Sequence, residues 1–182
     1  MRQLKGPGVS KAWLKPPTRQ ATIMLLVKKG EVLLAMKKRG FGVGKWNGVG
    51  GKSLPEEDIM TTAIRETQEE ISVVPLNLKK VAVLNFYFPL MPSEKNWNQQ
   101  VSVFTSKKWK GTPLESEEMK PQWFKFEDIP YSEMWSDDEV WLPKVLAGKK
   151  VQGDFVFGRH EKLIDHRLKE VSGFIKVNDG RC

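Results

Sequence analysis

The chain has 182 residues, 40% hydrophobic and 29% charged, which fits one globular domain and excludes a disordered chain. Thirty Lys and Arg against 22 Asp and Glu give a net charge of +8, which favours an anionic partner, either a polynucleotide or a small phosphorylated molecule. The longest apolar run near the start, residues 23–27, is far shorter than the ~20 residues that span a bilayer, so the sequence predicts no integral membrane protein.

The N-terminal third of the chain contains a basic segment, a hairpin signal and a glycine-rich loop. Residues 1–18 are basic and interrupted by prolines, which is typical of a flexible arm. Two apolar runs around Lys29-Gly30 then predict a β-hairpin. Residues 39–52 hold six glycines in fourteen positions, which suits a loop that approaches a ligand closely.

The rest of the chain alternates helical and strand-like patterns. A helix is predicted over Pro55–Ile71, with Ser53 as its cap and Glu56 completing a capping box. Further elements are expected in chain order: strands at 76–88, 99–108 and 122–126, a helix from Ser136 that ends by Gly148, and strands at 151–157 and 162–171. This mixture indicates an α+β domain with α/β/α layers over residues 19–172, followed by a tail at 173–182.

Three acidic side chains gather on one side of the first predicted helix. Glu66 and Glu70 are four residues apart and share a face, and Glu69 lies beside them. Such carboxylates repel one another unless a cation lies among them, and Arg65 alone cannot neutralise all three. One cysteine and two histidines are too few for a soft-ligand site, so a hard ion such as Mg²⁺ fits best. The alternative is a solvated acidic face with an Arg65–Glu69 ion pair.

The helix lies in a longer pattern that resembles the Nudix box, G-x5-E-x7-R-E-U-x-E-E-x-G-U, where U is a bulky aliphatic residue. Thr67 and Ser72 depart from it: Thr67 stands at the aliphatic position, and Ser72 must end the helix where the box has glycine. The resemblance implies the Nudix fold, a mixed β-sheet core between helices. The positions that match with the same spacing are Gly51, Glu57, Arg65, Glu66, Glu69, Glu70 and Val73.

Three further segments, MKKRGFGVGKWNGVGGK, GTPLESEEMKPQWF and IPYSEMWSDDEVWLP, resemble the MutT-type oxidised purine nucleoside triphosphatases of that family. The resemblance covers residues 20–171. It implies Mg²⁺-dependent hydrolysis, with Mn²⁺ as the alternative metal, of triphosphates such as 8-oxo-dGTP and 2-hydroxy-dATP to monophosphate and pyrophosphate. We expect a monomeric, cytoplasmic enzyme that cleans the nucleotide pool and has a small-molecule substrate, with no membrane or stable nucleic-acid partner.

The resemblance also implies roles for the acidic residues. Glu69 completes the acidic cluster, and the general base stays open among the four glutamates. Arg65 and Glu57 are expected to orient the cluster through an ion pair. Lys37 is expected to contact a phosphate, with an ordinary exposed lysine as the alternative. The implied metal ligands are three carboxylates and one backbone carbonyl: Gly50, Glu66, Glu70 and Glu118.

A second set of residues is implied for the base. Trp135 offers a face for stacking on a purine, and Asp137 and Asp138 follow it. One of two adjacent acids in an apolar pocket can stay protonated and donate a hydrogen bond while the other accepts, so the pair can bind an oxo or an amino edge. Asn47 would bind another edge and Phe41 would form a wall. Without the resemblance, this segment would be a helix N-cap beside a core tryptophan.

Two other functions remain open from the sequence. The Nudix box is common to hydrolases of nucleotide sugars, dinucleoside polyphosphates, NADH and capped RNA, and only the base-binding set favours oxidised purines. Gln99 also stands where the family pocket has a methionine. The second alternative is single-strand nucleic-acid binding by the basic arm and the tryptophans, although no RRM, KH or zinc signature is present.

Overall fold

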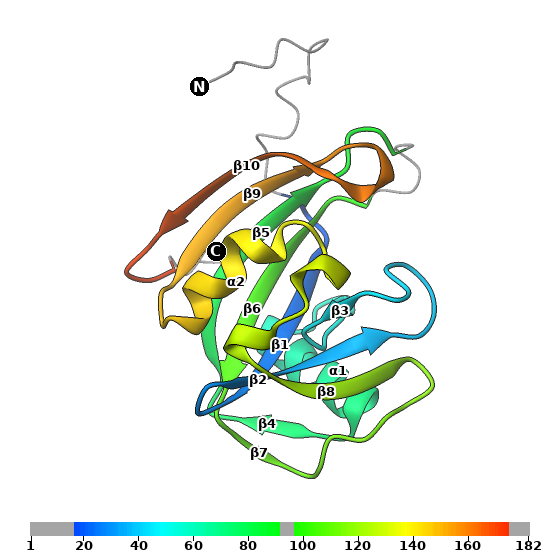
Figure 1. Ribbon diagram of the computed structural model, residues 1–182, viewed down its shortest axis with the longest axis vertical. Coiled ribbons are helices and arrows are strands. Elements are labelled where there is room, and N and C mark those ends of the chain that lie inside the picture. The colour runs from blue at the N-terminus through cyan, green and yellow to red at the C-terminus, as the bar shows by residue number, and fades with distance from the viewer. Residues whose placement is uncertain (1–16, 92–96, 175–182) are drawn as a thin grey trace.

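The structure is a computed structural model that describes residues 17–91 and 97–174 (Figure 1). Most of the predicted arm and of the predicted tail therefore lies outside the described residues. Within the described part, no helix is both long enough and apolar enough to cross a membrane.

The described residues form ten strands and two α-helices. In chain order these are β1 (Gln20–Lys28), β2 (Glu31–Lys37), β3 (Trp46–Asn47), α1 (Ile59–Ile71), β4 (Val74–Leu76), β5 (Lys79–Tyr87), β6 (Gln99–Ser106), β7 (Lys108–Lys110), β8 (Met119–Lys125), α2 (Asp138–Leu146), β9 (Val151–Phe157) and β10 (Leu163–Glu170). Short 3₁₀ turns occupy Phe126–Asp128, Tyr131–Glu133 and Arg159–Glu161.

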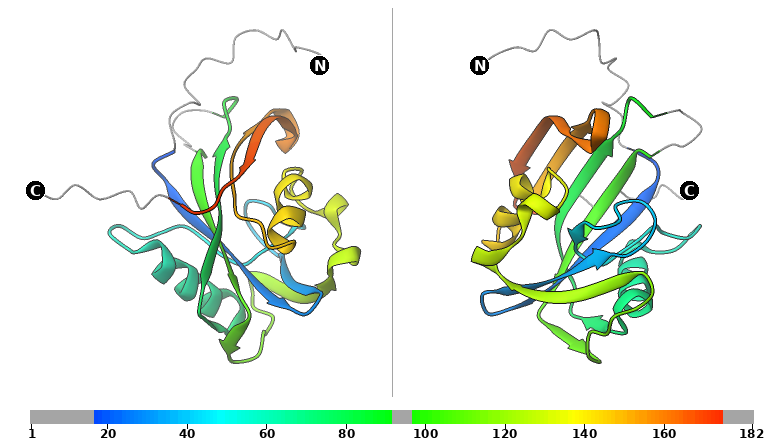
Figure 2. Two further views of the ribbon diagram at one scale, coloured as in Figure 1. Left: turned by 90° about the vertical axis from the view of Figure 1, so that its left-hand side faces the viewer. Right: turned by 45° about the vertical axis from the view of Figure 1, so that its right-hand side comes forward.

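Most strands belong to one mixed sheet. Its order is β10-β9-β5-β6-β1-β2-β3, with β8 also pairing with β2, while β4 and β7 form a separate small sheet. The β1–β6 and β5–β9 pairs are parallel, whereas β1–β2, β5–β6 and β9–β10 are antiparallel. Figure 2 shows α1 and α2 on opposite sides of this sheet. The α/β/α layering predicted from the sequence is therefore confirmed.

The alternation of side chains along β1 divides the interior into two cores. Ile23 and Leu25 face the core that contains Trp141 of α2. Met24 and Leu26 face the other core, which contains residues of α1. Successive side chains of a strand point to opposite faces, so one buried strand supports both layers at once.

The N-terminal boundary of α1 differs from the prediction. The helix begins at Ile59, and its cap is Asp58, whose Oδ1 accepts a hydrogen bond from the Met60 N–H at 2.9 Å. Glu56 has a φ of +62°, which a helix cannot contain. The predicted capping box from Ser53 was therefore wrong. The C-terminal end at Ile71 is as predicted.

Ser72 ends α1 in the left-handed conformation, at the position where the Nudix box has glycine. Its φ is +61°, and its N–H donates to the Gln68 carbonyl at 3.0 Å. The strand predicted at 76–88 begins later, as β5 at Lys79, because Asn77 has a φ of +52° that interrupts the extended segment after β4. β8 begins at Met119 rather than at 122, because it pairs with β2 along its length.

Candidate active site

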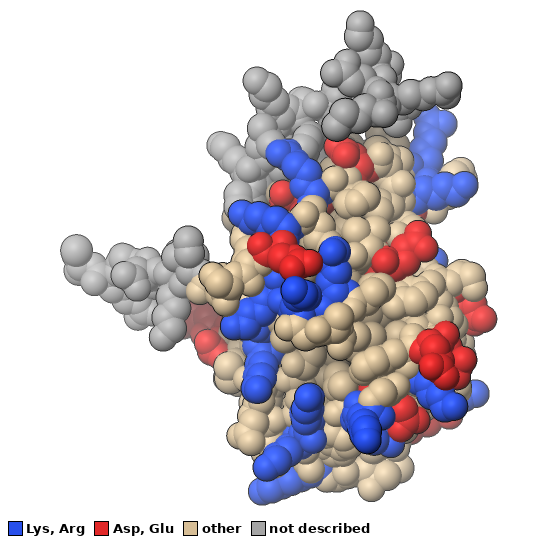
Figure 3. Space-filling model, turned by 60° about the vertical axis from the view of Figure 1, so that its left-hand side comes forward, with Lys and Arg blue, Asp and Glu red and all other residues tan. Residues whose placement is uncertain are grey.

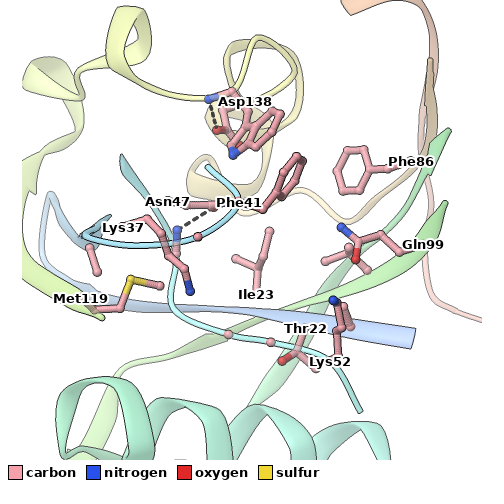
Figure 4. A pocket seen from close by; sticks show the side chains of 18 of the residues that line it. Thr22, Ile23, Lys37, Phe41, Asn47, Lys52, Phe86, Gln99, Met119 and Asp138 are labelled. Atoms are coloured by element: carbon pink, nitrogen blue, oxygen red, sulfur yellow. Dashed lines mark hydrogen bonds between the residues drawn. The ribbon is translucent and has the colours of Figure 1, made fainter. Parts of the chain in front are cut away.

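A cavity of about 570 Å³ lies on the α2 side of the sheet, between the glycine-rich loop and the N-terminal end of α2 (Figure 4). Its lining comes from β1, β2, β3, β5, β6 and β9, from the segment before β8 and from the start of α2. These elements are far apart in the sequence, and the mixed sheet brings them together. The predicted site residues that line the cavity are Lys37, Phe41, Asn47, Gly50, Glu118, Trp135, Asp137 and Asp138.

One end of the cavity meets the carboxylates of α1 through the loop that precedes the helix. Glu70 is buried, and its Oε2 accepts a hydrogen bond from the Gly50 N–H at 2.9 Å. A Cβ atom at Gly51 would lie 2.3 Å from Glu66 Oε2, so only glycine allows this approach. The glycines at 50 and 51 therefore place backbone directly against two of the predicted metal ligands.

Glu70 is a buried acid that has the Lys37 ammonium group on one side and further carboxylates nearby. Burial raises the pKa of Glu70 to about 7, even though the Gly50 N–H and Lys37 act in the opposite direction. Glu66 and Glu118 are close enough to raise it further. Clustered carboxylate oxygens that lack a full counter-charge are a donor set that fits a hard divalent cation.

Lys37 links the acidic end to the cavity. Its Nζ lies 3.6 Å from Glu70 Oε1 and 3.5 Å from Glu118 Oε2. Glu118 comes from the segment before β8 and is also paired with Arg39. Among the described residues, no three Asp, Glu, His or Cys side chains already form a metal cage. The ammonium group of Lys37 lies within salt-bridge distance of two of the three implied carboxylate ligands.

Arg65 is the centre of an ion-pair network on the exposed side of the cluster. Its Nε donates to Glu57 Oε1 at 2.8 Å, and its NH1 donates to Glu66 at 2.7 Å and to Glu69 at 3.0 Å. The hydrogen bonds from Arg65 are the main cause that lowers the pKa of Glu57 to about 2. Both the expected Arg65–Glu57 pair and the alternative Arg65–Glu69 pair are present, and Arg65 holds three carboxylates at once.

The other end of the cavity holds two buried acids. Asp137 and Asp138 are 3% and 2% exposed. Asp137 Oδ2 accepts a hydrogen bond from the Trp141 indole N–H at 2.9 Å, and Asp138 Oδ2 accepts from the Trp135 N–H at 3.1 Å. Burial raises the pKa of both, and the nearness of Asp137 raises that of Asp138 further. Ionising both is therefore costly, and the pair favours retaining a proton.

The helix-cap alternative for these acids agrees with their position at the start of α2, but not with the side-chain hydrogen bond of Asp137. Asp137 occupies the N-cap position of α2 but makes no side-chain capping hydrogen bond. Its carboxylate instead binds the indole of Trp141. An N-cap normally bonds the free N–H groups of the first helical turn. The geometry therefore leaves Asp137 and Asp138 as lining groups of the cavity.

Aromatic rings form the walls next to the acid pair. The Phe41 and Trp135 ring centroids are 5.0 Å apart, and Trp97 lies 4.5 Å from Phe41. Phe157 meets the edge of Trp135 at 5.9 Å. Asn47 lines the same region, and its Oδ1 accepts a hydrogen bond from the following Gly48 N–H. Flat apolar walls with a few polar groups at one edge suit a purine.

Several cavity residues were not predicted from the sequence. Thr22 is 3% exposed, and within the described residues its hydroxyl is a buried polar atom without a hydrogen-bond partner. Lys52 and Met119 also line the cavity, as does Gln99, for which the family resemblance had already implied a pocket position. The sequence did contain a signal for Thr22, because it is a polar residue within the apolar run of β1. The positions of Lys52 and Met119 depend on strand pairings that the sequence does not display.

Comparisons with known proteins agree with this geometry. The NUDIX domain family matches residues 16–145. An oxidized purine nucleoside triphosphate hydrolase from Danio rerio is 43% identical over 150 residues, which cover 82% of this chain and 94% of the relative. The protein of the same name from Mus musculus is 41% identical over 157 residues, which cover 86% of this chain and 98% of that relative.

The fold has a solved counterpart as well. The crystal structure of the mutator MutT protein from Bacillus halodurans matches with a TM-score of 0.70 and 25% identity, over 82% of this chain and 97% of that one. Sequence, fold and the glutamate-rich helix thus lead to one assignment. This chain belongs to the Nudix family of hydrolases.

Proposed function

We propose that this chain hydrolyses oxidised purine nucleoside triphosphates, such as 8-oxo-dGTP and 2-hydroxy-dATP, to monophosphate and pyrophosphate. The observation that carries the proposal is one cavity that is lined by the buried acid pair, Asp137 and Asp138, and also by Gly50 and Lys37, which contact Glu70 of the Nudix helix. Both curated relatives are named for hydrolysis of oxidised purine nucleoside triphosphates. The activity would remove oxidised nucleotides before a polymerase uses them.

The metal in this proposal is Mg²⁺, because enzymes of the family generally use a divalent ion, most commonly Mg²⁺. Glu66, Glu70, Glu118 and the carbonyl of Gly50 are the groups that would hold it. The chemistry supplied by the bound ion is neutralisation of phosphate oxygens and polarisation of the attacking water. The buried carboxylate of Glu70, with Glu66 and Glu118 nearby, is the feature of this structure that fits such an ion.

The protein's own groups would position the reactants and move the proton. One glutamate of the cluster would accept the proton of the attacking water, and Glu66, Glu69, Glu70 and Glu118 all remain candidates. Arg65 would keep three carboxylates oriented through its ion pairs. Lys37 lies between the acidic end and the cavity, where its ammonium group would bind a phosphate oxygen.

The acid pair would recognise the base. Because burial favours one proton on Asp137 or Asp138, the pair presents a donor and an acceptor side by side. A proton that can sit on either acid lets the same pair bind an oxo or an amino edge. Trp135 and Phe41 would hold the ring plane.

A turnover panel tests the proposal. The substrates are 8-oxo-dGTP, 2-hydroxy-dATP, dGTP, a nucleotide sugar, a dinucleoside polyphosphate, NADH and capped RNA, each with Mg²⁺ and with chelator. We expect the highest kcat/KM on the oxidised purines, with pyrophosphate as product. Preference for any of the last four substrates would assign another Nudix activity.

Trp135→Ala should lower kcat/KM for all purine triphosphates by a similar factor, because stacking does not distinguish the edges of the base.

Nucleic-acid binding is the second candidate, and the observation that suggests it is a surface with many basic side chains. Figure 3 shows many lysine and arginine side chains on one face, with acidic side chains among them. Such a face attracts polynucleotides less well than an uninterrupted basic groove does. Binding of an oligonucleotide that weakens with salt, without nucleotide hydrolysis, would support this candidate.

We also propose that the enzyme is a monomer in the cytoplasm, the reducing compartment that a single cysteine favours.

A further inference from the structure

Gln99 is a polar residue at a strand position whose equivalents along the strand are apolar. Gln99, Val101 and Val103 alternate on β6, so they share one face of the sheet. Val101 and Val103 are 3% and 0% exposed and belong to the core on the α2 side. The residue opposite Gln99 on β5 is Phe86. An amide therefore stands where the strand otherwise buries hydrocarbon.

The side chain of Gln99 extends into the cavity. Figure 4 shows its amide turned toward the cavity interior, beside Phe86 and above Thr22. Throughout the described ranges, 17–91 and 97–174, no hydrogen bond to this amide is found. The next residue, Gln100, is different, since its Nε2 donates to Asn85 Oδ1 at 3.0 Å. A half-buried amide beside an aromatic ring needs a partner, and the partner on this side comes from solvent or ligand.

The chemistry of an 8-oxopurine supplies a matching partner. Figure 4 shows Asp138 and Gln99 on different sides of the cavity that both line, so a purine whose six-membered ring meets the acid pair turns its imidazole edge elsewhere. In 8-oxoguanine that edge carries an N7–H donor next to a C8=O acceptor. A carboxamide offers an acceptor and a donor in the complementary order, so two hydrogen bonds can form. An unmodified purine has only the N7 acceptor there.

We propose that Gln99 is a specificity-determining residue that binds the imidazole edge of 8-oxopurines through its carboxamide. This inference rests on the proposed function, because it concerns the base end of the same site. It predicts that the enzyme distinguishes damage on the imidazole ring from damage on the six-membered ring. A purine oxidised at C2, such as 2-hydroxy-dATP, gains nothing from Gln99 beyond what the unmodified edge offers.

The test compares Gln99→Met, which keeps the length of the side chain without its hydrogen bonds, with Gln100→Met as a matched control on the opposite face. Wild type and both variants are assayed on 8-oxo-dGTP, 2-hydroxy-dATP and dGTP. In Gln99→Met, the ratio of kcat/KM for 8-oxo-dGTP to that for 2-hydroxy-dATP should fall about 5- to 100-fold, the effect of two neutral hydrogen bonds. In Gln100→Met the ratio should stay unchanged.

Binding supplies a readout that does not depend on turnover. The Kd of 8-oxo-dGMP relative to dGMP, measured by calorimetry, should rise in Gln99→Met and also in Gln99→Glu, which keeps the shape but loses the donor. An unchanged ratio in both assays, or an equal loss on every purine, would overturn the role of Gln99 alone. Failure of the wild type to hydrolyse any oxidised purine would instead overturn the proposed function, and the inference with it.

Discussion

The Nζ atom of Lys37 lies 3.6 Å from the Oε1 atom of Glu70, so a lysine that lines the cavity also contacts the buried acid of α1. The two residues come from β2 and from the last turn of the helix, on different layers of the fold. The same ammonium group lies near Glu118. A substrate phosphate that enters between these groups would meet one positive charge already fixed by two carboxylates.

The first prediction concerns that lysine. Lys37→Met should lower kcat/KM about 10- to 100-fold, because a charge-assisted hydrogen bond contributes about 1.5–3 kcal/mol. Lys38→Met is the matched control, since Lys38 pairs with the exposed Glu115 at 2.8 Å. Steady-state kinetics on 8-oxo-dGTP compare the two variants. Equal losses in both would mean that Lys37 acts only through general surface charge.

The second prediction concerns the acid itself. Glu70→Gln should lower turnover at least ~100-fold, a loss of a few kcal/mol of transition-state stabilisation. The amide oxygen of glutamine can still accept from the Gly50 N–H, so the fold should persist. Circular dichroism checks the fold, and turnover is followed during Mg²⁺ titration. Chelator should abolish wild-type activity, and full activity in chelator would contradict the metal assignment.

The third prediction is that alanine at two neighbouring glycines, Gly50 and Gly51, affects different properties of the protein. A Cβ at Gly51 would meet the Glu66 carboxylate at 2.3 Å, whereas a Cβ at Gly50 would meet the Thr22 backbone oxygen at 2.1 Å. A side chain can move, so Gly51→Ala should keep its melting temperature and lose about 10-fold or more in turnover. Backbone cannot move so easily, so Gly50→Ala should lose about 1–3 kcal/mol of stability. Equal melting temperatures for the two variants would show that small shifts of the neighbouring atoms accommodate both added Cβ atoms.

The fourth prediction is a pH dependence of stability. Burial raises the pKa of Asp137 from 3.8 to about 6, so the folded state favours the protonated acid. Its contribution is fully present below pH 3.8 and is lost as the pH rises through 6. Asp137→Asn removes this titration, and should therefore be more stable relative to wild type at pH 7 than at pH 4, by about 1–3 kcal/mol.

The measurement for this last prediction is chemical unfolding of both proteins across pH 4–7 with chelator present. Glu70 titrates in an overlapping range in both proteins and cancels in the difference between their curves, which therefore reports the titration of the Asp137–Asp138 pair. The Asn side chain can still accept from the Trp141 indole N–H. A difference that does not change with pH would show that Asp137 stays ionised in the folded protein.

The sequence predicted the site where its residues are fixed by local spacing. The i, i+4 spacing on α1 places Arg65 within reach of Glu69, and the structure has that contact. The prediction from the sequence failed where side-chain contacts outside these helical spacings decide the structure. Ser53 satisfies the rules for a helix cap, but its hydroxyl accepts a hydrogen bond from Thr62, and Asp58 caps the helix instead. The contacts of Lys37 and the positions of Lys52 and Met119 follow from long-range strand pairing, which no local pattern shows.

The parallel pairing of β5 with β9 affects how the protein is made. Ala82 pairs with Val151, so the sheet behind the cavity is complete only after most of the chain has left the ribosome. The acidic helix is synthesised long before α2 and its two buried acids. A product that stops before Asp137 would therefore carry the whole glutamate motif without the acid pair of the cavity and without β9, the neighbour that covers the edge of β5. Such a fragment would retain the family signature in its sequence, expose a bare strand edge to other chains and lack the two acids that we propose recognise the base.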